Sequence, residues 1–310
     1  MTRLPSALRR RPPPEAIRWA ERALGRRARV TGYRRLRGGT SAAVHLLRVE
    51  GARGVRWAVL RRFVREDWLA EEPDIAEREA RILDALSATE FPVPHLLAAD
   101  PAGAECDVPA VLMTRVAGRL DLAPSDLDGY LWQLARFLPV LHDLGVVEGL
   151  PAYRSWFRSQ PFEPPSWSRQ PELWHRADAL VSGPPPEEAV GRVTLIHRDY
   201  HPANTLWRYG RLSGVTDWVN ACNGPPAIDV AHCSVNLSAL FGVEAAEAFR
   251  RAYEAVAGVE QHPYWDLLDA LDTGPPEEDQ WHDAGRFDLD GPLLYARCEE
   301  YLEGLVRRLA

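Results

Sequence analysis

The stretch HRDYHPAN, residues 197–204, follows a short apolar run at 193–196, and this order predicts a loop directly after a buried strand. Asp217 lies thirteen residues after Asn204, at the end of a second short apolar run. A carboxylate at Asp199 can accept a proton from an attacking hydroxyl group. The side-chain oxygens of Asn204 and Asp217 are of the kind that Mg²⁺ binds. The segment therefore predicts a catalytic carboxylate together with two oxygen ligands for a metal ion.

The spacing H-R-D-x-x-x-x-N in this stretch is that of the protein-kinase catalytic loop, and Asp217 stands where a second metal-binding aspartate is expected. The longer run LIHRDYHPANTLW…GVTDWVNACNGPPAIDVAH resembles the aminoglycoside phosphotransferase family, which includes antibiotic-resistance kinases and choline, homoserine and fructosamine kinases. The resemblance is strongest over 193–233 and weaker over 36–62 and 74–88. It implies an enzyme that uses ATP, or GTP in its place, and Mg²⁺ to phosphorylate an alcohol group of a small molecule.

Several site residues in the second half of the chain follow from this resemblance, position by position. By its position in the motif, Asp199 matches the catalytic base of the family, and Asn204 and Asp217 match the residues that hold Mg²⁺. Asp229 in AIDVAH matches an aspartate that braces the catalytic loop. We expect His197 to support the same loop by bonding to backbone groups rather than by reacting.

The nucleotide is expected to contact residues in the first half of the chain. The strand-like run WAVLR, 57–61, occupies the place of the kinase V-A-I-K motif, so Arg61 stands where lysine would be. Arginine still offers a positive, multidentate phosphate donor, and Glu79 in the following helix is available to pair with it, with Glu77 as second choice. The resemblance also implies a loop over the phosphates and a hinge that bonds adenine through its backbone. The residues of these segments are Gly38, Gly39, Thr40, Ser41 and Ala42 in the loop, and Met113, Arg115 and Val116 in the hinge.

Hydrophobic periodicity extends the prediction to the whole chain. Five short strands are expected in the first part, the first three as an antiparallel meander, with one main helix, and the pattern after Gly118 is mainly helical. With the resemblance, this implies an α+β, two-lobed protein-kinase-like fold: an N-terminal antiparallel five-stranded sheet with one main helix, then a C-terminal mainly helical lobe. The expected domains are 1–114, a hinge at 115–120, and 121–310. The predicted helices are 12–25, 73–88, 125–145, 171–181, 236–258, 263–271 and 291–309, and the predicted strands are 29–37, 43–49, 55–63, 95–99, 110–114, 193–196 and 212–216.

The charge of the chain is spread unevenly. The 310 residues carry a formal net charge of −7, and all 37 basic residues are arginine, which excludes any chemistry that requires a lysine. Residues 1–75 carry 18 arginines against 8 acidic residues, whereas residues 260–310 carry 13 acidic residues against 4 arginines. An acidic C-terminal end would attract a cationic acceptor such as an aminoglycoside. The acidic residues considered for this contact are Asp283, Glu299 and Glu300.

Three other functions stay open from the sequence alone. A kinase of a neutral or amine metabolite, of the choline, homoserine or sugar-amine type, would use the same catalytic residues. His197, Asp199 and His201 form H-x-D-x-H, which could ligate Zn²⁺ or Mn²⁺ in a metal-dependent hydrolase. A non-catalytic nucleotide-binding module is the third alternative, and the presence of a base and of both metal ligands disfavours it.

The sequence carries no sign of a membrane segment or of secretion. No run approaches the ~18 apolar residues that a membrane span needs, and the basic start MTRLPSALRRRPPP lacks the apolar core of a signal peptide. The four cysteines have no C-x-x-C spacing, so we expect free thiols. The expected protein is cytoplasmic, a monomer or a homodimer, with no nucleic-acid or membrane partner.

Overall fold

The chain forms two compact units. A computed structural model describes residues 6–36, 42–52, 54–155, 161–273 and 291–310. The first unit contains the described residues up to Ala117 together with Gly214–Val219, and the second unit contains the other described residues. The chain leaves the first unit between Ala117 and Gly118, within the range expected as a hinge. The return of Gly214–Val219 to the first unit is not part of the expected boundaries.

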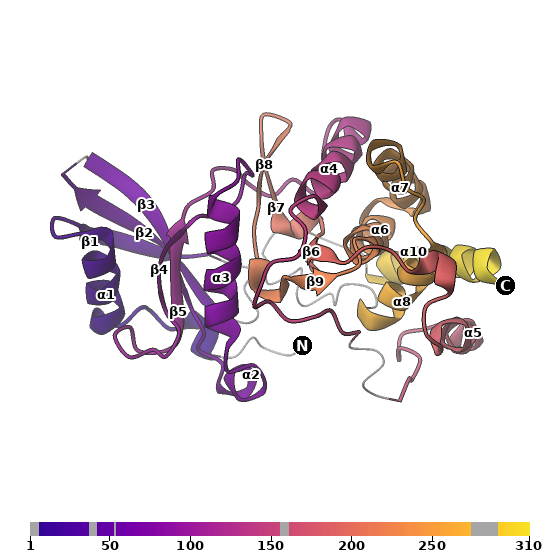
Figure 1. Cartoon of the computed structure of the whole chain (residues 1–310), viewed down its shortest axis with the longest axis horizontal. Helices are drawn as coiled ribbons and strands as arrows, with labels where there is room; N and C mark the ends of the chain where they lie inside the picture. Colours follow the sequence, from indigo (N-terminus) through magenta and orange to yellow (C-terminus); the bar gives the residue numbers. More distant parts are fainter. Residues whose placement is uncertain (1–5, 37–41, 53, 156–160, 274–290) are drawn as a thin grey trace. The chain divides into compact units, whose positions relative to one another are not determined.

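The first unit is built on an antiparallel five-stranded sheet with the strand order β1-β2-β3-β5-β4 (Figure 1). The first three strands form the predicted meander, in which β2 pairs with both β1 and β3. The predicted five-stranded sheet is therefore confirmed. The strands are β1 (Arg29–Arg35), β2 (Ala43–Gly51), β3 (Gly54–Arg62), β4 (Leu96–Asp100) and β5 (Ala110–Thr114).

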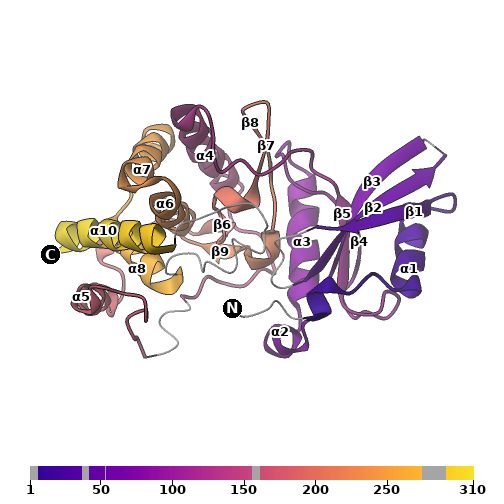
Figure 2. The ribbon, with the colours of Figure 1, turned by 180° about the vertical axis from the view of Figure 1, so that it is seen from behind.

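The two faces of this sheet are covered by different helices, α1 (Pro14–Leu24) and α3 (Ile75–Ser87) (Figures 1 and 2). Alternate residues of β2, β3 and β5, Leu60 among them, pack with α1 in one apolar cluster. Because successive side chains of a strand point to opposite faces, Arg61 faces α3. Glu79 lies on the buried side of α3, so the fold brings the two predicted partners together. Two short elements complete the unit, η1 (Ser6–Arg9) and α2 (Glu66–Glu71).

The second unit is mainly helical, as predicted, and is built around α6 (Ala227–Phe241) (Figure 1). Every residue of α6 from Ile228 to Leu240 is buried, which is typical of a helix enclosed on all sides. The helices packed around it are α4 (Leu127–His142), α7 (Val243–Ala257), α8 (Pro263–Thr273) and α10 (Gly291–Leu309). The other elements of the second unit are α5 (Pro171–Val181), η3 (Glu187–Ala189), β6 (Thr194–Ile196), η4 (Pro202–Asn204), β7 (Thr205–Arg208) and β9 (Cys222–Gly224). Two elements, β8 (Arg211–Val215) and η5 (Trp218–Asn220), are divided between the two units, because Gly214–Val219 belongs to the first.

The expectation of a single helix over 236–258 is wrong. Two helices, α6 and α7, meet at Gly242, whose φ of 98° lies in the region that glycine adopts readily and that ends a helix. The start of α6 is missed because a helix buried on all sides has no amphipathic period. The short strand β9, paired with β6, is missed because three residues are too few to show alternation.

Among the described residues, no helix combines the length and the apolar composition that crossing a membrane would require.

Asp266 is a carboxylate that the second unit buries almost completely. It lies on α8 with 1% exposure, and it accepts hydrogen bonds from Tyr301 Oη at 2.8 Å and from Gln261 Nε2 at 3.1 Å. Burial raises the pKa of Asp266 from 3.8 to about 6, although these hydrogen bonds act in the opposite direction. A carboxyl group whose pKa is higher in the folded than in the unfolded protein stabilises the fold when the carboxyl group is protonated. That contribution is full below about pH 4 and is lost as the pH rises through about 6.

We therefore expect Asp266→Asn to raise the free energy of unfolding at pH 7.5 by about 1–3 kcal/mol. A pKa change from 3.8 to about 6 corresponds to about 3 kcal/mol, and the amide oxygen can still accept a hydrogen bond. The gain should shrink below pH 6 and vanish near pH 4, which urea denaturation at several pH values measures. The matched control is Asp84→Asn, exposed on α3, with an expected change within about 0.5 kcal/mol. A gain that is the same at every pH would contradict the explanation.

Candidate active site

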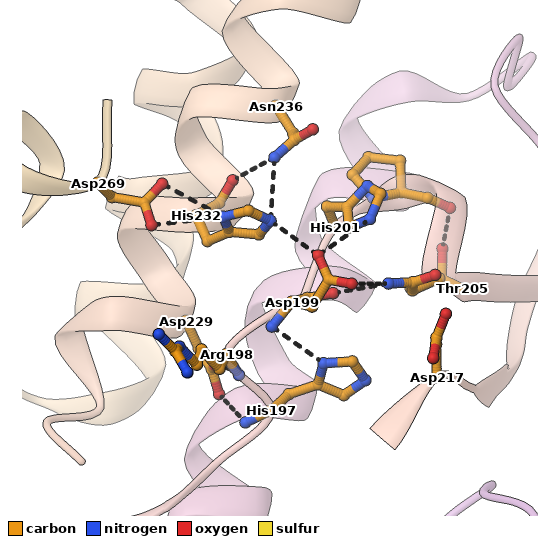
Figure 3. Close-up of polar contacts among 12 residues, drawn as sticks. His197, Arg198, Asp199, His201, Thr205, Asp217, Asp229, His232, Asn236 and Asp269 are labelled. Carbon is orange, nitrogen blue, oxygen red and sulfur yellow. Dashed lines mark hydrogen bonds and ion pairs between the residues drawn. The ribbon is translucent and has the colours of Figure 1, made fainter. Parts of the chain in front are cut away.

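The predicted catalytic stretch forms the loop between β6 and η4 in the second unit. Arg198 in this loop has a φ of 67°, which is uncommon for a residue with a side chain. The carboxylate of Asp229 accepts the backbone N–H of Arg198 at 2.6 Å and the backbone N–H of His197 at 2.9 Å (Figure 3). These two bonds hold the loop in its unusual conformation directly before Asp199.

Asp229 is itself fixed in the first turn of α6. It is fully buried, and His142 Nε2 of α4 lies 3.1 Å from its Oδ2. Pro225 and Pro226 stand directly before the helix, and a carboxylate in a first turn is favoured by the helix dipole. Asp229 therefore ties α4 and α6 to the backbone of the loop.

The carboxylate of Asp199 is held by polar contacts from two sides (Figure 3). Its side chain is 28% exposed. Oδ2 accepts a hydrogen bond at 3.0 Å from Asn204 Nδ2, which also donates to the backbone oxygen of Asp199 at 2.9 Å. Oδ1 lies 3.2 Å from His232 Nε2 and 3.5 Å from His201 Nε2. Burial alone would raise the pKa of Asp199, but the neighbouring histidines, His201 first, hold it well below its usual range, so the group is ionised at neutral pH.

His232 is the residue of this site that the sequence does not single out. It lies on α6 three residues after Asp229, and its Nδ1 is 3.3 Å from the carboxylate of buried Asp269 on α8. Burial by itself would lower the pKa of His232, but Asp269 and Asp199 raise it to about 10. The i, i+3 spacing within DVAH was the available sequence signal. The contact with Asp269 comes from another helix and has no local signal.

In the first unit, Arg61 lies buried between two carboxylates. Its Nη1 donates to Glu79 of α3, and its Nη2 donates to Asp217 at 2.5 Å. Glu77, the second choice, is exposed and instead pairs with Arg81 at 2.8 Å. Burial alone would lower the pKa of Arg61, but Asp217 and Glu79 raise it. Asp217 has a φ of 69°, so it too holds a strained backbone conformation.

The other residues expected to contact the nucleotide divide into two groups. Gly38, Gly39, Thr40 and Ser41 lie outside the described residues. In the predicted hinge, Met113 is buried in β5, whereas Arg115 is exposed, with its guanidinium 6.0 Å from the centroid of the Trp57 ring. Val116 packs against the backbone of Gly214, where an added Cβ would lie 2.2 Å from Val116 Cγ1. Position 214 therefore requires glycine.

The three acidic residues expected to bind the acceptor have different surroundings. Asp283 lies outside the described residues, and Glu300 is exposed on α10. Glu299 is only 5% exposed. Its Oε1 accepts hydrogen bonds from Ser168 Oγ at 2.6 Å, the backbone N–H of Arg169 at 3.1 Å, the backbone N–H of Gln170 at 3.2 Å and Trp174 Nε1 at 3.2 Å. Glu299 therefore joins α10 to the start of α5.

His197 does not join Asp199 and His201 in one ligand group, as the H-x-D-x-H interpretation requires. Its ring is fully buried, and its Nδ1 accepts the backbone N–H of Asp199 at 3.3 Å. The group of three that the structure brings together contains His232 instead. The ligand set of the alternative H-x-D-x-H interpretation is therefore not brought together in the structure.

The fold and the site can be compared with known proteins. The sequence profile of the phosphotransferase enzyme family matches residues 32–271. No curated protein matches the chain. Among solved structures, the apoenzyme of macrolide 2'-phosphotransferase MphH from Brachybacterium faecium has 21% identity and a TM-score of 0.53, with 86% of this chain and 95% of that chain covered.

Two further solved structures are complexes. One is a thermostable mutant of aminoglycoside phosphotransferase APH(4)-Ia with AMP-PNP and hygromycin B, at 18% identity and a TM-score of 0.60, covering 90% of this chain and 94% of that one. The other is the streptomycin–ATP complex of APH(2")-IIa, at 15% identity and a TM-score of 0.56, covering 84% and 88%. At these identities the likeness shows the kinase-like fold alone. The profile covers well over half of the sequence, and on that ground the chain belongs to the phosphotransferase enzyme family.

Proposed function

We propose that the chain is an ATP- and Mg²⁺-dependent O-phosphotransferase that acts on a hydroxyl group of a small molecule. The observation that carries this proposal is the carboxylate of Asp199, which is ionised, partly exposed and fixed by Asn204 and His232. The loop that carries it is locked by Asp229. A hydroxyl group that donates a hydrogen bond to Asp199 would be held in one orientation for attack on a phosphoryl group.

The lowered pKa of Asp199 makes this carboxylate a weak base, so its main task would be to orient the acceptor. This fits phosphoryl transfer, in which the protein contributes mostly positioning and neutralisation of charge. The proton of the hydroxyl group would pass to Asp199 as the new P–O bond forms.

Oxygen donors suited to Mg²⁺ are present in both units. Asp217 offers a carboxylate that is 28% exposed, and Asn204 offers Oδ1 because its Nδ2 is the atom that donates to Asp199. Asp217 belongs to the first unit and Asn204 to the second. Bound Mg²⁺ would neutralise charge on the phosphate oxygens of ATP. Arg61 would hold the side chains of Asp217 and Glu79 in place and would add positive charge for the phosphates.

For the acceptor, we propose a cationic molecule of the aminoglycoside type, which would make the chain an antibiotic-resistance enzyme. The net charge of −7 and the excess of acidic residues at 260–310 support a cation. In the described part of this region, Glu300 is exposed and Asp272 is half-buried. The similar folds solved with hygromycin B and with streptomycin are consistent with this class. A kinase of a neutral or amine metabolite would share the catalytic residues and is the alternative.

Release of ADP from the purified full-length chain tests the proposal. The acceptors to compare are aminoglycosides, a macrolide, choline, homoserine and amino sugars, each with ATP or GTP and with Mg²⁺ or EDTA. We expect release that depends on Mg²⁺ and on a cationic acceptor, with a KM that rises as salt increases, because the screening length is about 10 Å at 0.1 M salt. Nucleotide binding without turnover for any acceptor would favour the non-catalytic module. A preferred neutral or anionic acceptor would overturn the cationic assignment.

A further inference from the structure

Three side chains of the second unit direct possible metal-binding atoms at one another. The Oδ1 atom of Asp199 lies 3.2 Å from His232 Nε2 and 3.5 Å from His201 Nε2, and one ligand atom from each residue lies within 4.8 Å of the others. Both imidazole rings point toward the same carboxylate (Figure 3). No second group of three such residues occurs in the part of the chain that the structure describes.

The spacing of these atoms fits tetrahedral Zn²⁺. Bonds from Zn²⁺ to nitrogen and carboxylate oxygen are about 2.0–2.2 Å long, so two ligands at the tetrahedral angle are about 3.3–3.5 Å apart. The two distances from Asp199 Oδ1, 3.2 and 3.5 Å, are close to this value. Only the separation of the two imidazoles would need to adjust, and His201 stands in a loop rather than in a helix.

The imidazole of His232 has the outer-shell partner that metal-binding histidines usually have. Its Nδ1 lies 3.3 Å from the carboxylate of Asp269, which is buried on α8. This contact fixes the orientation of the ring and leaves Nε2 directed at Asp199. A carboxylate on the far nitrogen also makes the ligating nitrogen more basic, which strengthens a bond to a metal.

The donor set selects Zn²⁺ over Mg²⁺. Two imidazole nitrogens and one carboxylate oxygen suit Zn²⁺, whereas Mg²⁺ prefers oxygen ligands throughout. Three protein ligands leave the fourth position to water. The site is accessible to an ion, because the side chains of Asp199 and His201 are 28% and 15% exposed.

The geometry points to a Zn²⁺ site formed by Asp199, His201 and His232, with Asp269 as outer-shell partner, that inhibits the enzyme when it is filled. Zn²⁺ bound to Asp199 would neutralise the carboxylate to which the acceptor hydroxyl group would donate. This site is distinct from the Mg²⁺ ligands Asn204 and Asp217 proposed above. The inhibition rests on the proposed function, whereas the binding of Zn²⁺ does not.

Zn²⁺ binding is measured on the full-length protein, without nucleotide or Mg²⁺, by titration against a competing chromophoric chelator. We expect one equivalent to bind to the wild type. Asp269→Asn should weaken binding about 10–100-fold, and His201→Gln and His232→Gln at least about 100-fold, since a ligand contributes more than its outer-shell partner. The matched control, His175→Gln on the exposed side of α5, should bind like the wild type. Co²⁺ should give the intensified visible absorption of a four-coordinate site, and His201→Gln should abolish it.

The proposal is overturned if the wild type binds no stoichiometric Zn²⁺, or if the ligand variants bind as tightly as His175→Gln. His201 is the more exposed of the two histidines, so His201→Gln remains decisive if His232→Gln fails to fold by circular dichroism. In the ADP-release assay with excess Mg²⁺, Zn²⁺ should inhibit the wild type at concentrations near its measured Kd. His201→Gln, compared with its own Zn²⁺-free rate, should need at least about 100-fold more Zn²⁺. Stoichiometric Zn²⁺ binding by a protein with no turnover would refute the proposed function and leave the Zn²⁺ site standing, whereas turnover without Zn²⁺ binding would do the reverse.

Discussion

Asp199→Asn is expected to lower the turnover of the best acceptor by about 10²–10⁴-fold, because the carboxylate would both orient the hydroxyl group and take its proton. An amide in this place cannot take the proton of the hydroxyl group, and it loses the charge that pairs with His232. The affinity for ATP should stay nearly unchanged, because the proposed role of Asp199 concerns the acceptor. Steady-state ADP release measures the first effect, and titration with a fluorescent nucleotide measures the second.

The matched control for this substitution is Asp128→Asn, which removes an exposed carboxylate from the first turn of α4 in the same unit. It should leave kcat and KM within about twofold of the wild type, because surface substitutions of this kind change little. Full turnover in Asp199→Asn would remove Asp199 from the mechanism. A loss of nucleotide affinity equal to the loss of turnover would show that the substitution had disturbed more than the acceptor.

Asp217→Ala is expected to abolish the part of the ATP affinity that depends on Mg²⁺. The substitution removes a charged oxygen ligand and leaves the Nη2 group of Arg61 without its carboxylate partner. Once this ligand is lost, the ATP affinity measured with Mg²⁺ should fall to about the affinity measured in EDTA. Asn204→Ala should weaken the affinity less, because a neutral ligand is lost.

Nucleotide titrations with Mg²⁺ and with EDTA separate the two effects in Asp217→Ala. In EDTA, any remaining difference from the wild type reports the disturbed pair with Arg61. Asp217→Asn is the second variant, since its amide oxygen can still accept the hydrogen bond from Arg61 while the negative charge is gone. If Asn204→Ala proved more damaging than Asp217→Ala, the roles of the two ligands would have to be exchanged.

The sheet and the central loop could be predicted because their signals are local. The pairing of Arg61 with Glu79 is expected because WAVLR resembles the V-A-I-K motif and Glu79 lies in the next helix. The structure places Glu79 on the buried side of α3, where it accepts a hydrogen bond from Arg61. The loop predicted from the spacing of the polar residues at 197–204 is found directly after β6, as expected. In these segments each local preference agrees with the final fold.

Other contacts depend on which helices pack together, and a short sequence window cannot report that. His232 meets Asp269 only because α6 and α8 are neighbours in the second unit. Glu299 has the same charge as the exposed Glu300 beside it, yet α10 turns Glu299 inward, where it accepts hydrogen bonds from the start of α5. A count of acidic residues at 260–310 therefore cannot tell which carboxylates are buried and structural and which are exposed to solvent.

The presence of arginine rather than lysine between Glu79 and Asp217 also determines which chemical probes can label this protein. Electrophilic nucleotide analogues label many ATP-binding proteins by acylating a lysine amine that has lost its proton. Arginine stays protonated in proteins, and the chain has no lysine anywhere in its sequence. Arg61 is buried beside two carboxylates that favour its charged form still further. Profiling of a proteome with lysine-directed ATP probes would therefore not detect this protein, even with ATP bound as proposed above.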